Sequence, residues 1–475
     1  MAIMKWLLLI TIAVLTILIA GSRHCNGVAC VGFADKAWAA IPANLTKLRP
    51  IKGVSYQPSP SDDNQQQNLG GFNNVYFDSD FDNTDFAALW GKDGTGTGRQ
   101  DLATIAAAGI NFLHIYNWNP ERDHGAFLDA SNANGLKLDV PISNFTACLI
   151  IGNGCQGVSA ASYKTAYDNI KKIFDNIYKG GTSPHPAAAI WDIFNEYDLE
   201  TNIDPQLVVF AIQAILKLEA DAGVPVPNQL PFMVPVSNAV RNQADYKAAN
   251  HTQPAYFQQA ETVYLGLNPG KTDKDIPPGI IATVALSTAL QTTSTGNKTS
   301  YQAANDSGPV TVAPIPANFW TTRFIAAVNP FTTGRTVNKY VTDAGQFQSA
   351  FPGTTVWNSL PPLFFSEMGI NRPPGMTAQG QADFISRQLK CTNPWAVDAT
   401  STPQGYFLGS VIFEYSYEAR NGNWGMFFFT NPLNFTNHTT GGGGTYRVDS
   451  LNEQPAWKAV TDGYKETALT CPPEP

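Results

Sequence analysis

Two glutamates in this chain of 475 residues each follow a short apolar stretch. Trp191–Glu196 reads Trp-Asp-Ile-Phe-Asn-Glu, and Leu363–Gly369 reads Leu-Phe-Phe-Ser-Glu-Met-Gly. A carboxylate at the end of a buried strand is either a catalytic group or a cap for nearby backbone N–H groups. Two such groups favour catalysis, because cleavage of a glycosidic bond through a covalent intermediate uses two carboxyl groups about 5 Å apart. The Asn195 side chain would then hydrogen-bond the 2-hydroxyl of the sugar.

Other chemistries lack their motifs in this chain. It has no Gly-x-Ser-x-Gly nucleophile elbow, no His-Glu-x-x-His helix, no phosphate-binding loop and no dinucleotide fingerprint. Its six histidines show no metal-ligand spacing. We therefore expect neither a metal site nor a cofactor.

The elements that would position the two glutamates alternate along the chain. From Ile51 onward, short apolar stretches alternate with segments of helical period, which indicates β-α units and a parallel sheet. Eight strands predict a closed (β/α)8 TIM barrel with loop insertions, and Glu196 and Glu367 would end its fourth and seventh strands at the catalytic rim. The expected strands are Ile51–Tyr56, Phe112–Tyr116, Leu136–Ile142, Ala189–Phe194, Phe232–Val236, Phe324–Val328, Leu363–Phe365 and Phe407–Tyr415. The expected helices are Asp101–Ala108, Ala126–Asn134, Tyr163–Tyr178, Pro205–Ala222, Tyr256–Leu265, Val341–Ala350, Ala378–Leu389 and Pro455–Thr467.

The amino terminus predicts export. Residues 1–22 combine Lys5, an apolar stretch from Trp6 to Ala20 and small residues after it, which is typical of a secretory signal peptide; an uncleaved membrane anchor is the alternative. Residues 23–50 would be an N-terminal extension and 51–470 the catalytic domain, with an insertion around 266–318. We expect a secreted protein, free or associated with a cell wall, without stable membrane insertion after signal cleavage.

The charge of the chain argues against nucleic acid as a partner, because the net charge is −8, only 14% of the residues are charged and there is no long basic run. We expect a monomer. Six cysteines favour disulfides: Cys148 with Cys155 would close a small loop, and Cys391 with Cys471 would tie the last helix to an earlier one, although the connectivity is a guess. Seven Asn-x-Ser/Thr tripeptides are candidate glycosylation sites.

Four segments together resemble the fungal β-1,3-glucanosyltransferases of glycoside hydrolase family 72, within the clan A retaining glycosidases. They are Ile51–Gln57, Gly109–Tyr116, Pro362–Asn371 and Gly409–Glu418. The resemblance implies that Glu196 is the general acid/base, that Glu367 is the nucleophile, and that Asn195, Gln57, Tyr116 and Tyr415 line the sugar site.

Three positions depart from that family. His114 stands where the family has an arginine, Pro141 falls where the third strand should end in an aspartate, and Val328–Phe331 has no clear counterpart of the tyrosine in the sixth strand. Both glutamates are kept, so the resemblance implies activity on β-1,3-glucan, with transfer and hydrolysis both open.

Three further aromatic residues, Tyr197, Trp118 and Trp424, are candidates for acceptor subsites, with packing an equal alternative. A β-glucan or a related polysaccharide is thus the expected partner. The alternatives are a clan A hydrolase of another β-glycan, favoured by the departures, and a non-catalytic glycan-binding wall protein, which would be expected to have lost one carboxylate.

Overall fold

The structure of the chain is a computed structural model. It describes residues 43–57, 87–91, 98–143, 162–199, 205–237, 297–304, 306–334, 361–397, 407–416, 424–429, 435–439 and 445–467, with shorter pieces at 24–25, 28–29, 146, 286, 290, 337 and 471–472. The signal-peptide region 1–22, the helices expected at 256–265 and 341–350, and Cys148 and Cys155 lie outside these residues. No helix among the described residues is long and apolar enough to cross a membrane.

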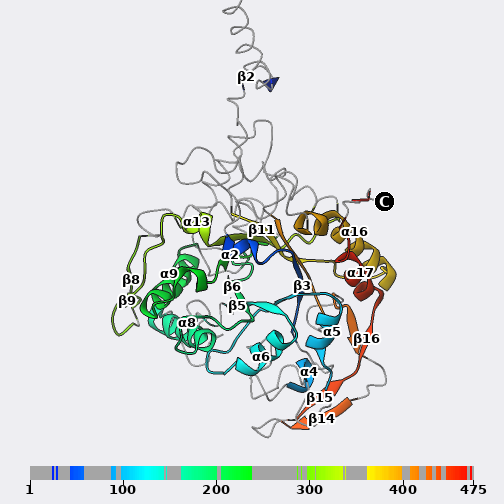
Figure 1. Cartoon of the computed structure of the whole chain (residues 1–475), viewed down its shortest axis with the longest axis horizontal. Coiled ribbons are helices and arrows are strands. Elements are labelled where there is room, and N and C mark those ends of the chain that lie inside the picture. Colours follow the sequence, from blue (N-terminus) through cyan, green and yellow to red (C-terminus); the bar gives the residue numbers. More distant parts are fainter. Residues whose placement is uncertain are drawn as a thin grey trace, which may run out of the picture.

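Eight parallel strands close into a barrel, as predicted (Figure 1). Their order follows the chain around the barrel, and the eighth strand pairs with the first through Gly409 and Ile51. Gly409 has a φ of +137°, and a Cβ there would lie 2.0 Å from the Ile51 carbonyl oxygen, so only glycine fits where the barrel closes. The strands are β3 (Ile51–Ser55), β4 (Phe112–His114), β5 (Lys137–Ile142), β6 (Ala188–Ile193), β7 (Phe232–Met233), β10 (Phe324–Val328), β11 (Leu363–Met368) and β12 (Phe407–Ile412).

Helices surround the barrel and follow the predicted positions where the structure describes them. The longer ones are α5 (Asp101–Ala107), α6 (Gly125–Ala133), α8 (Tyr163–Tyr178), α9 (Pro205–Asp221), α16 (Ala378–Val397) and α17 (Pro455–Gly463). The short ones are α2 (Ala43–Thr46), α4 (Ala87–Trp90), α13 (Phe319–Thr322) and a 3-10 turn at Val226–Asn228. The sequence did not predict these four.

Helix α8 shows why the sequence folds as it does. The Ser162 hydroxyl caps its first turn by accepting from Thr165 N at 3.1 Å, and Asp306, from the inserted segment, accepts from Ser162 Oγ and from two backbone N–H groups of that turn. Buried apolar side chains at helical spacing face the strands, while Lys164 and Asp168 pair on the outer face. The described part of the insertion around Asp306 therefore contacts α8, one of the helices outside the strands.

Apolar side chains fill the amino-terminal half of the barrel interior. Phe112, Ile190, Ala327 and Phe364 point inward from four strands and form one buried cluster. Leu45, from α2, is completely buried in the same cluster, so this part of the predicted N-terminal extension forms the floor of the barrel.

The carboxyl-terminal region departs from prediction in two places. Helix α16 continues to Val397, past the end expected at Leu389, and contains Pro394 in its last turn. The predicted disulfide Cys391–Cys471 is confirmed and joins this stretch to the chain end after α17.

After β12, two further antiparallel pairs occur, β13 (Phe427–Phe429) with β16 (Leu451–Glu453) and β14 (Phe435–Thr439) with β15 (Thr445–Asp449).

Candidate active site

A polar layer lies one step beyond the apolar interior, toward the carboxyl ends of the strands. Side chains two residues apart on a strand share a face, so each inward apolar residue predicts the direction of the residue two positions later. Phe112 is followed by His114, Ile190 by Asp192, and Ala327 by Asn329, which are all buried. On β11 the pairing register shifts between Phe365 and Met368, and both Ser366 and Glu367 make polar contacts inside the barrel.

The loop after β6 presents Asn195 and Glu196 through a strained turn. Phe194 and Glu196 have φ values of +53° and +52°, the left-handed region, which costs a side-chain-bearing residue roughly 1–2 kcal/mol. Two contacts with the segment after β7 hold the turn: Glu196 N donates to Pro235 O at 3.0 Å, and Asp198 accepts from Ser237 N and Oγ. Burial raises the pKa of Asp198 to about 6, although the hydrogen bonds from Ser237 oppose the shift.

Side-chain amides connect the two predicted catalytic glutamates. Asn195 Nδ2 donates to Glu367 Oε1 at 2.9 Å. Asn329 Nδ2 lies 3.2 Å from both Asn195 Oδ1 and Glu196 Oε1, and Asn329 Oδ1 accepts from Ser366 Oγ at 2.7 Å. Glu367 is 4% exposed whereas Asn195 and Glu196 are half-buried, so the structure brings both glutamates to one polar network at the barrel rim.

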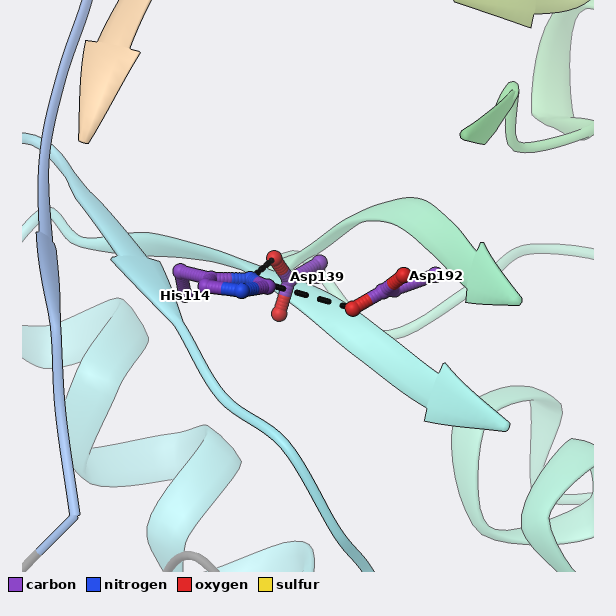
Figure 2. A group of neighbouring side chains, drawn as sticks. All are labelled: His114, Asp139 and Asp192. Atoms are coloured by element: carbon purple, nitrogen blue, oxygen red, sulfur yellow. Dashed lines mark hydrogen bonds and ion pairs between the residues drawn. The ribbon is translucent and has the colours of Figure 1, made fainter. Parts of the chain in front are cut away.

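A second group of titratable side chains, His114, Asp139 and Asp192, adjoins Glu367 through His114. Figure 2 shows these three side chains. His114 Nδ1 is 2.5 Å from Asp139 Oδ2 and 3.8 Å from Asp192 Oδ2, and its Nε2 is 3.3 Å from Glu367 Oε1. Burial and the neighbouring charge of Asp139 raise the pKa of Asp192 well above its usual range.

His114, Asp139 and Asp192 also bring possible metal-ligand atoms within 4.8 Å of one another. Two ligand atoms on one ion would lie about 3 Å apart or more, given metal–nitrogen bonds of about 2.0 Å. The separation of 2.5 Å between His114 Nδ1 and Asp139 Oδ2 is that of a direct hydrogen bond. The arrangement is therefore an ionic hydrogen-bonded cluster.

Aromatic rings gather beside this network. The Trp424 ring centroid lies 4.9 Å from that of Phe331 and 5.3 Å from that of Phe413, and Phe413 in turn contacts Tyr116 at 6.2 Å. All four side chains are half-buried. Of the predicted sugar-lining residues, Tyr116 and Trp424 thus retain partly exposed surface next to the polar network that contains both glutamates.

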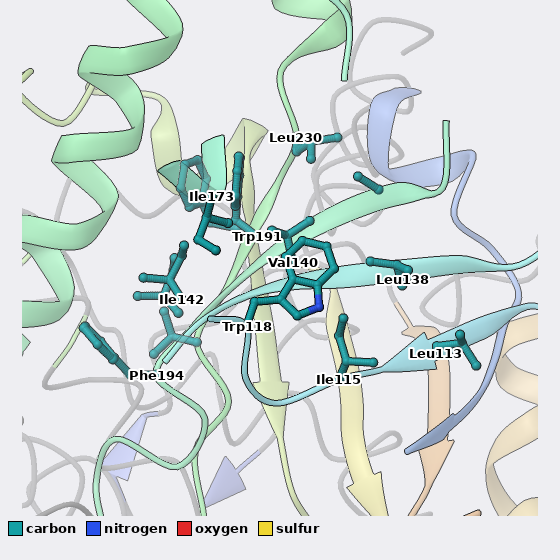
Figure 3. Packing of buried hydrophobic residues seen from close by; sticks show 14 of the residues in the cluster. Leu113, Ile115, Trp118, Leu138, Val140, Ile142, Ile173, Trp191, Phe194 and Leu230 are labelled. Carbon is teal, nitrogen blue, oxygen red and sulfur yellow. The ribbon is translucent and has the colours of Figure 1, made fainter. Parts of the chain in front are cut away.

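Three predicted contact residues lie elsewhere. Trp118 is 1% exposed and stacks on His124 at 4.3 Å, within the layer of apolar side chains outside the strands (Figure 3). Tyr197 is fully buried, and Tyr415 is 1% exposed with its hydroxyl 3.3 Å from Asp101 Oδ1. The burial of these three side chains favours packing, and their predicted contact with sugar remains a prediction.

Gln57 is buried just past the end of β3 and is 9% exposed. Its carbonyl oxygen is 3.5 Å from Ser416 Oγ, so its backbone joins the first and last strands of the barrel at the rim. Its predicted contact with sugar remains a prediction.

Sequence reasoning missed Asn329, Ser366, Asp139 and Asp192 as parts of the site. For Asn329 and Asp192 a signal existed, since each follows an inward apolar residue at a spacing of two. Ser366 had the same signal, since it follows the inward Phe364 at a spacing of two, whereas the inward contacts of Glu367 depend on the register shift in β11.

A cavity of about 470 Å³ occurs at the opposite end of the barrel. It is lined by Lys47, Arg49, Asn111, Lys137 and Leu230 among others, and by none of the carboxylates described above. The carboxylates of the candidate active site therefore lie outside this cavity.

No protein-family model and no curated protein matches the chain. Among solved structures, a mutant of Saccharomyces cerevisiae Gas2p in complex with laminaritetraose and laminaripentaose is similar at 12% identity and a TM-score of 0.45, over 88% of this chain and 64% of that one. Gas2p in complex with laminaripentaose is similar at 11% identity and a TM-score of 0.44, over 88% and 65%. The chain thus spans less than two thirds of these proteins. Likeness at this level does not decide an activity.

Proposed function

We propose that the chain is a retaining β-glycosidase or transglycosylase that acts on β-1,3-glucan by double displacement. The observation that supports it most is the bonded connection between Glu196 and Glu367 through Asn195 and Asn329. The choice of β-1,3-glucan rests on the resemblance of four sequence segments to glycoside hydrolase family 72. Secretion remains part of the proposal, supported by the sequence of residues 1–22.

In the first step, the Glu367 carboxylate attacks the anomeric carbon while Glu196 donates a proton to the departing glycosidic oxygen. Asn195 and His114 both contact Glu367 Oε1, which leaves Oε2 as the attacking oxygen in this proposal. In the second step, Glu196 accepts a proton from water or from a sugar hydroxyl, and that oxygen displaces Glu367. Water gives hydrolysis, and a sugar hydroxyl gives transfer.

Product analysis tests the activity. Purified protein is incubated with laminari-oligosaccharides, and the products are sized by mass spectrometry. Longer oligomers would demonstrate transfer and shorter ones hydrolysis. An unchanged profile on these and on β-1,4- and mixed-linkage glucans would contradict the proposal and favour glycan binding without turnover.

Trapping tests the nucleophile. A 2-deoxy-2-fluoro glucosyl fluoride slows the second step, so the glycosyl-enzyme should accumulate with the added mass on the peptide that contains Glu367. Glu367→Gln should remain unlabelled and inactive, whereas Glu121→Gln, at an exposed glutamate that pairs with Lys172, should label normally. Labelling of Glu367→Gln would refute the assignment.

A further inference from the structure

The side chain of His114 lies between two carboxylates in the barrel interior. Its Nδ1 faces Asp139 Oδ2 at 2.5 Å, and its Nε2 faces Glu367 Oε1 at 3.3 Å. His114 and Asp139 are completely buried, and Glu367 is 4% exposed. The three residues come from three different strands, β4, β5 and β11, and they meet in the buried interior of the barrel.

The hydrogen-bond partners of each carboxylate determine the protonation of the ring. Asp139 accepts from Ile115 N through Oδ1 at 2.9 Å, and Glu367 Oε1 also accepts from Asn195 Nδ2 at 2.9 Å. Both carboxylates therefore act as acceptors toward other donors. A neutral imidazole has a single N–H and can satisfy only one of them, whereas an imidazolium donates from both nitrogens.

We propose that His114 is a permanently protonated positioning residue, which donates to Asp139 and to Glu367 and so orients the nucleophile. The inference rests on the proposed function for the role of Glu367. The protonation state of His114 can be tested without any activity.

The surrounding charges are consistent with an imidazolium. Burial lowers the pKa of His114, but the negative charge of Asp139 and the hydrogen bonds to Asp139 and Glu367 outweigh burial and hold the pKa well above its ordinary value. The other facing groups are Asp192 on β6, with Oδ2 at 3.8 Å, and the Tyr116 ring, with its centroid at 4.6 Å. Asp192 Oδ1 has no hydrogen-bond partner among the described residues, which agrees with a neutral, protonated Asp192.

Asn195 and His114 contact the same oxygen of Glu367. They approach Oε1 from the loop after β6 and from β4, on different sides of the barrel, and so orient the carboxylate. Loss of the His114 donor should therefore leave the carboxylate less firmly oriented.

Nuclear magnetic resonance tests the protonation directly. Full-length protein labelled with ¹⁵N-histidine is recorded between about pH 5 and about pH 9, where an unperturbed histidine titrates. We expect one histidine with both ring nitrogens protonated throughout, absent from His114→Gln and titrating near neutrality in Asp139→Asn. A neutral His114 ring at about pH 8 in the wild-type protein would overturn the proposal, whether or not the protein turns over glucan.

Kinetics test the positioning role. His114→Gln should lower kcat by about 10- to 100-fold, the loss of one charge-assisted hydrogen bond, with a small change in KM. His124→Gln removes another buried histidine that contacts a carbonyl instead of a carboxylate, and its kcat should stay close to that of the wild-type protein. An unchanged kcat in a folded His114→Gln, or a loss that appears in KM alone, would contradict the positioning role.

Discussion

Asn195 donates a hydrogen bond to Glu367 across 172 residues of sequence. Because Asn195 precedes Glu196, this contact ties the loop after β6 to β11, the strand that carries the proposed nucleophile. Glu367 is thus contacted by the loop that carries Glu196, and disturbance of the amides between the two glutamates should affect catalysis more than folding.

Asn329→Ala tests that connection. The amide lies within hydrogen-bond distance of both Asn195 and Glu196, so its loss should lower kcat by about 10- to 100-fold with little change in KM. Ser366→Ala, which removes only the hydroxyl that supports Asn329, should have a smaller effect. Steady-state kinetics on laminari-oligosaccharides would decide it, and equal activity in Asn329→Ala and wild type would show that the bridge is dispensable.

Trp424→Ala and Trp118→Ala separate sugar contact from packing. Trp424 is half-buried beside Phe331 and Phe413, and its loss should raise KM while the protein stays folded. Trp118 is buried, and its loss should lower the free energy of unfolding by about 3–5 kcal/mol. Kinetics and denaturant unfolding of both variants measure this, and a KM effect confined to Trp118→Ala would reverse the assignment.

Asp198→Asn should change the pH dependence of stability. The pKa of Asp198 is raised to about 6 in the folded chain, so the folded chain binds the proton more tightly than the unfolded chain. The stability from this group is present below its unfolded pKa and is lost as the pH rises through about 6. The asparagine variant avoids the buried charge, and its thermal midpoint relative to wild type should rise from pH 4 to pH 8. A constant difference between the two proteins would contradict the buried-charge explanation.

Glu219→Gln should destabilise the outer layer of the fold. Arg323 makes a two-pronged contact with Glu219 at 2.7 and 2.9 Å, and both side chains are buried. Removal of one partner leaves a buried charge unpaired, at a cost of about 3–5 kcal/mol. The double variant Glu219→Gln with Arg323→Met should be less destabilised than Glu219→Gln in urea titrations. If the free-energy losses of Glu219→Gln and Arg323→Met simply added in the double variant, the two side chains would not be coupled.

Loss of the Cys391–Cys471 disulfide should also destabilise the chain. The cysteines are 80 residues apart, and a loop of that length predicts about 4.5 kcal/mol in the chain-entropy description. Cys471→Ser removes the bond with little loss of packing, whereas Cys391→Ala adds a small cavity at a fully buried position. Denaturant midpoints should therefore fall in both variants and further in Cys391→Ala.

The apolar pattern was sufficient to predict the barrel. All eight strands occur at the predicted places, because each is an apolar stretch between polar segments, and β10 agrees to the residue. Boundaries failed where tertiary contacts override a local signal. The helix predicted to end at Leu389 continues as α16 to Val397, past Pro394, and this extension is packed against α17 and anchored by Cys391.

The site was only partly predictable. Glu196 and Glu367 stand out because each ends an apolar stretch, whereas Asn329 was seen only as the absence of an expected tyrosine. The burial of the aromatic residues was the least predictable feature. Trp118, Tyr197 and Tyr415 lie near strand ends as Tyr116 does, but whether such a ring is buried depends on turn geometry, which the residue type does not encode.

Leu45 closes the barrel at the end away from the glutamates. A hydrated interior would screen the ionic contacts of His114 and restore ordinary acidities to Asp139 and Asp192. Leu45 thus helps to exclude water from the barrel interior that contains His114, Asp139 and Asp192. Leu45→Ser should admit water to the interior and lower the pH at which His114 releases its proton. The substitution would do so without a change in any residue that contacts His114.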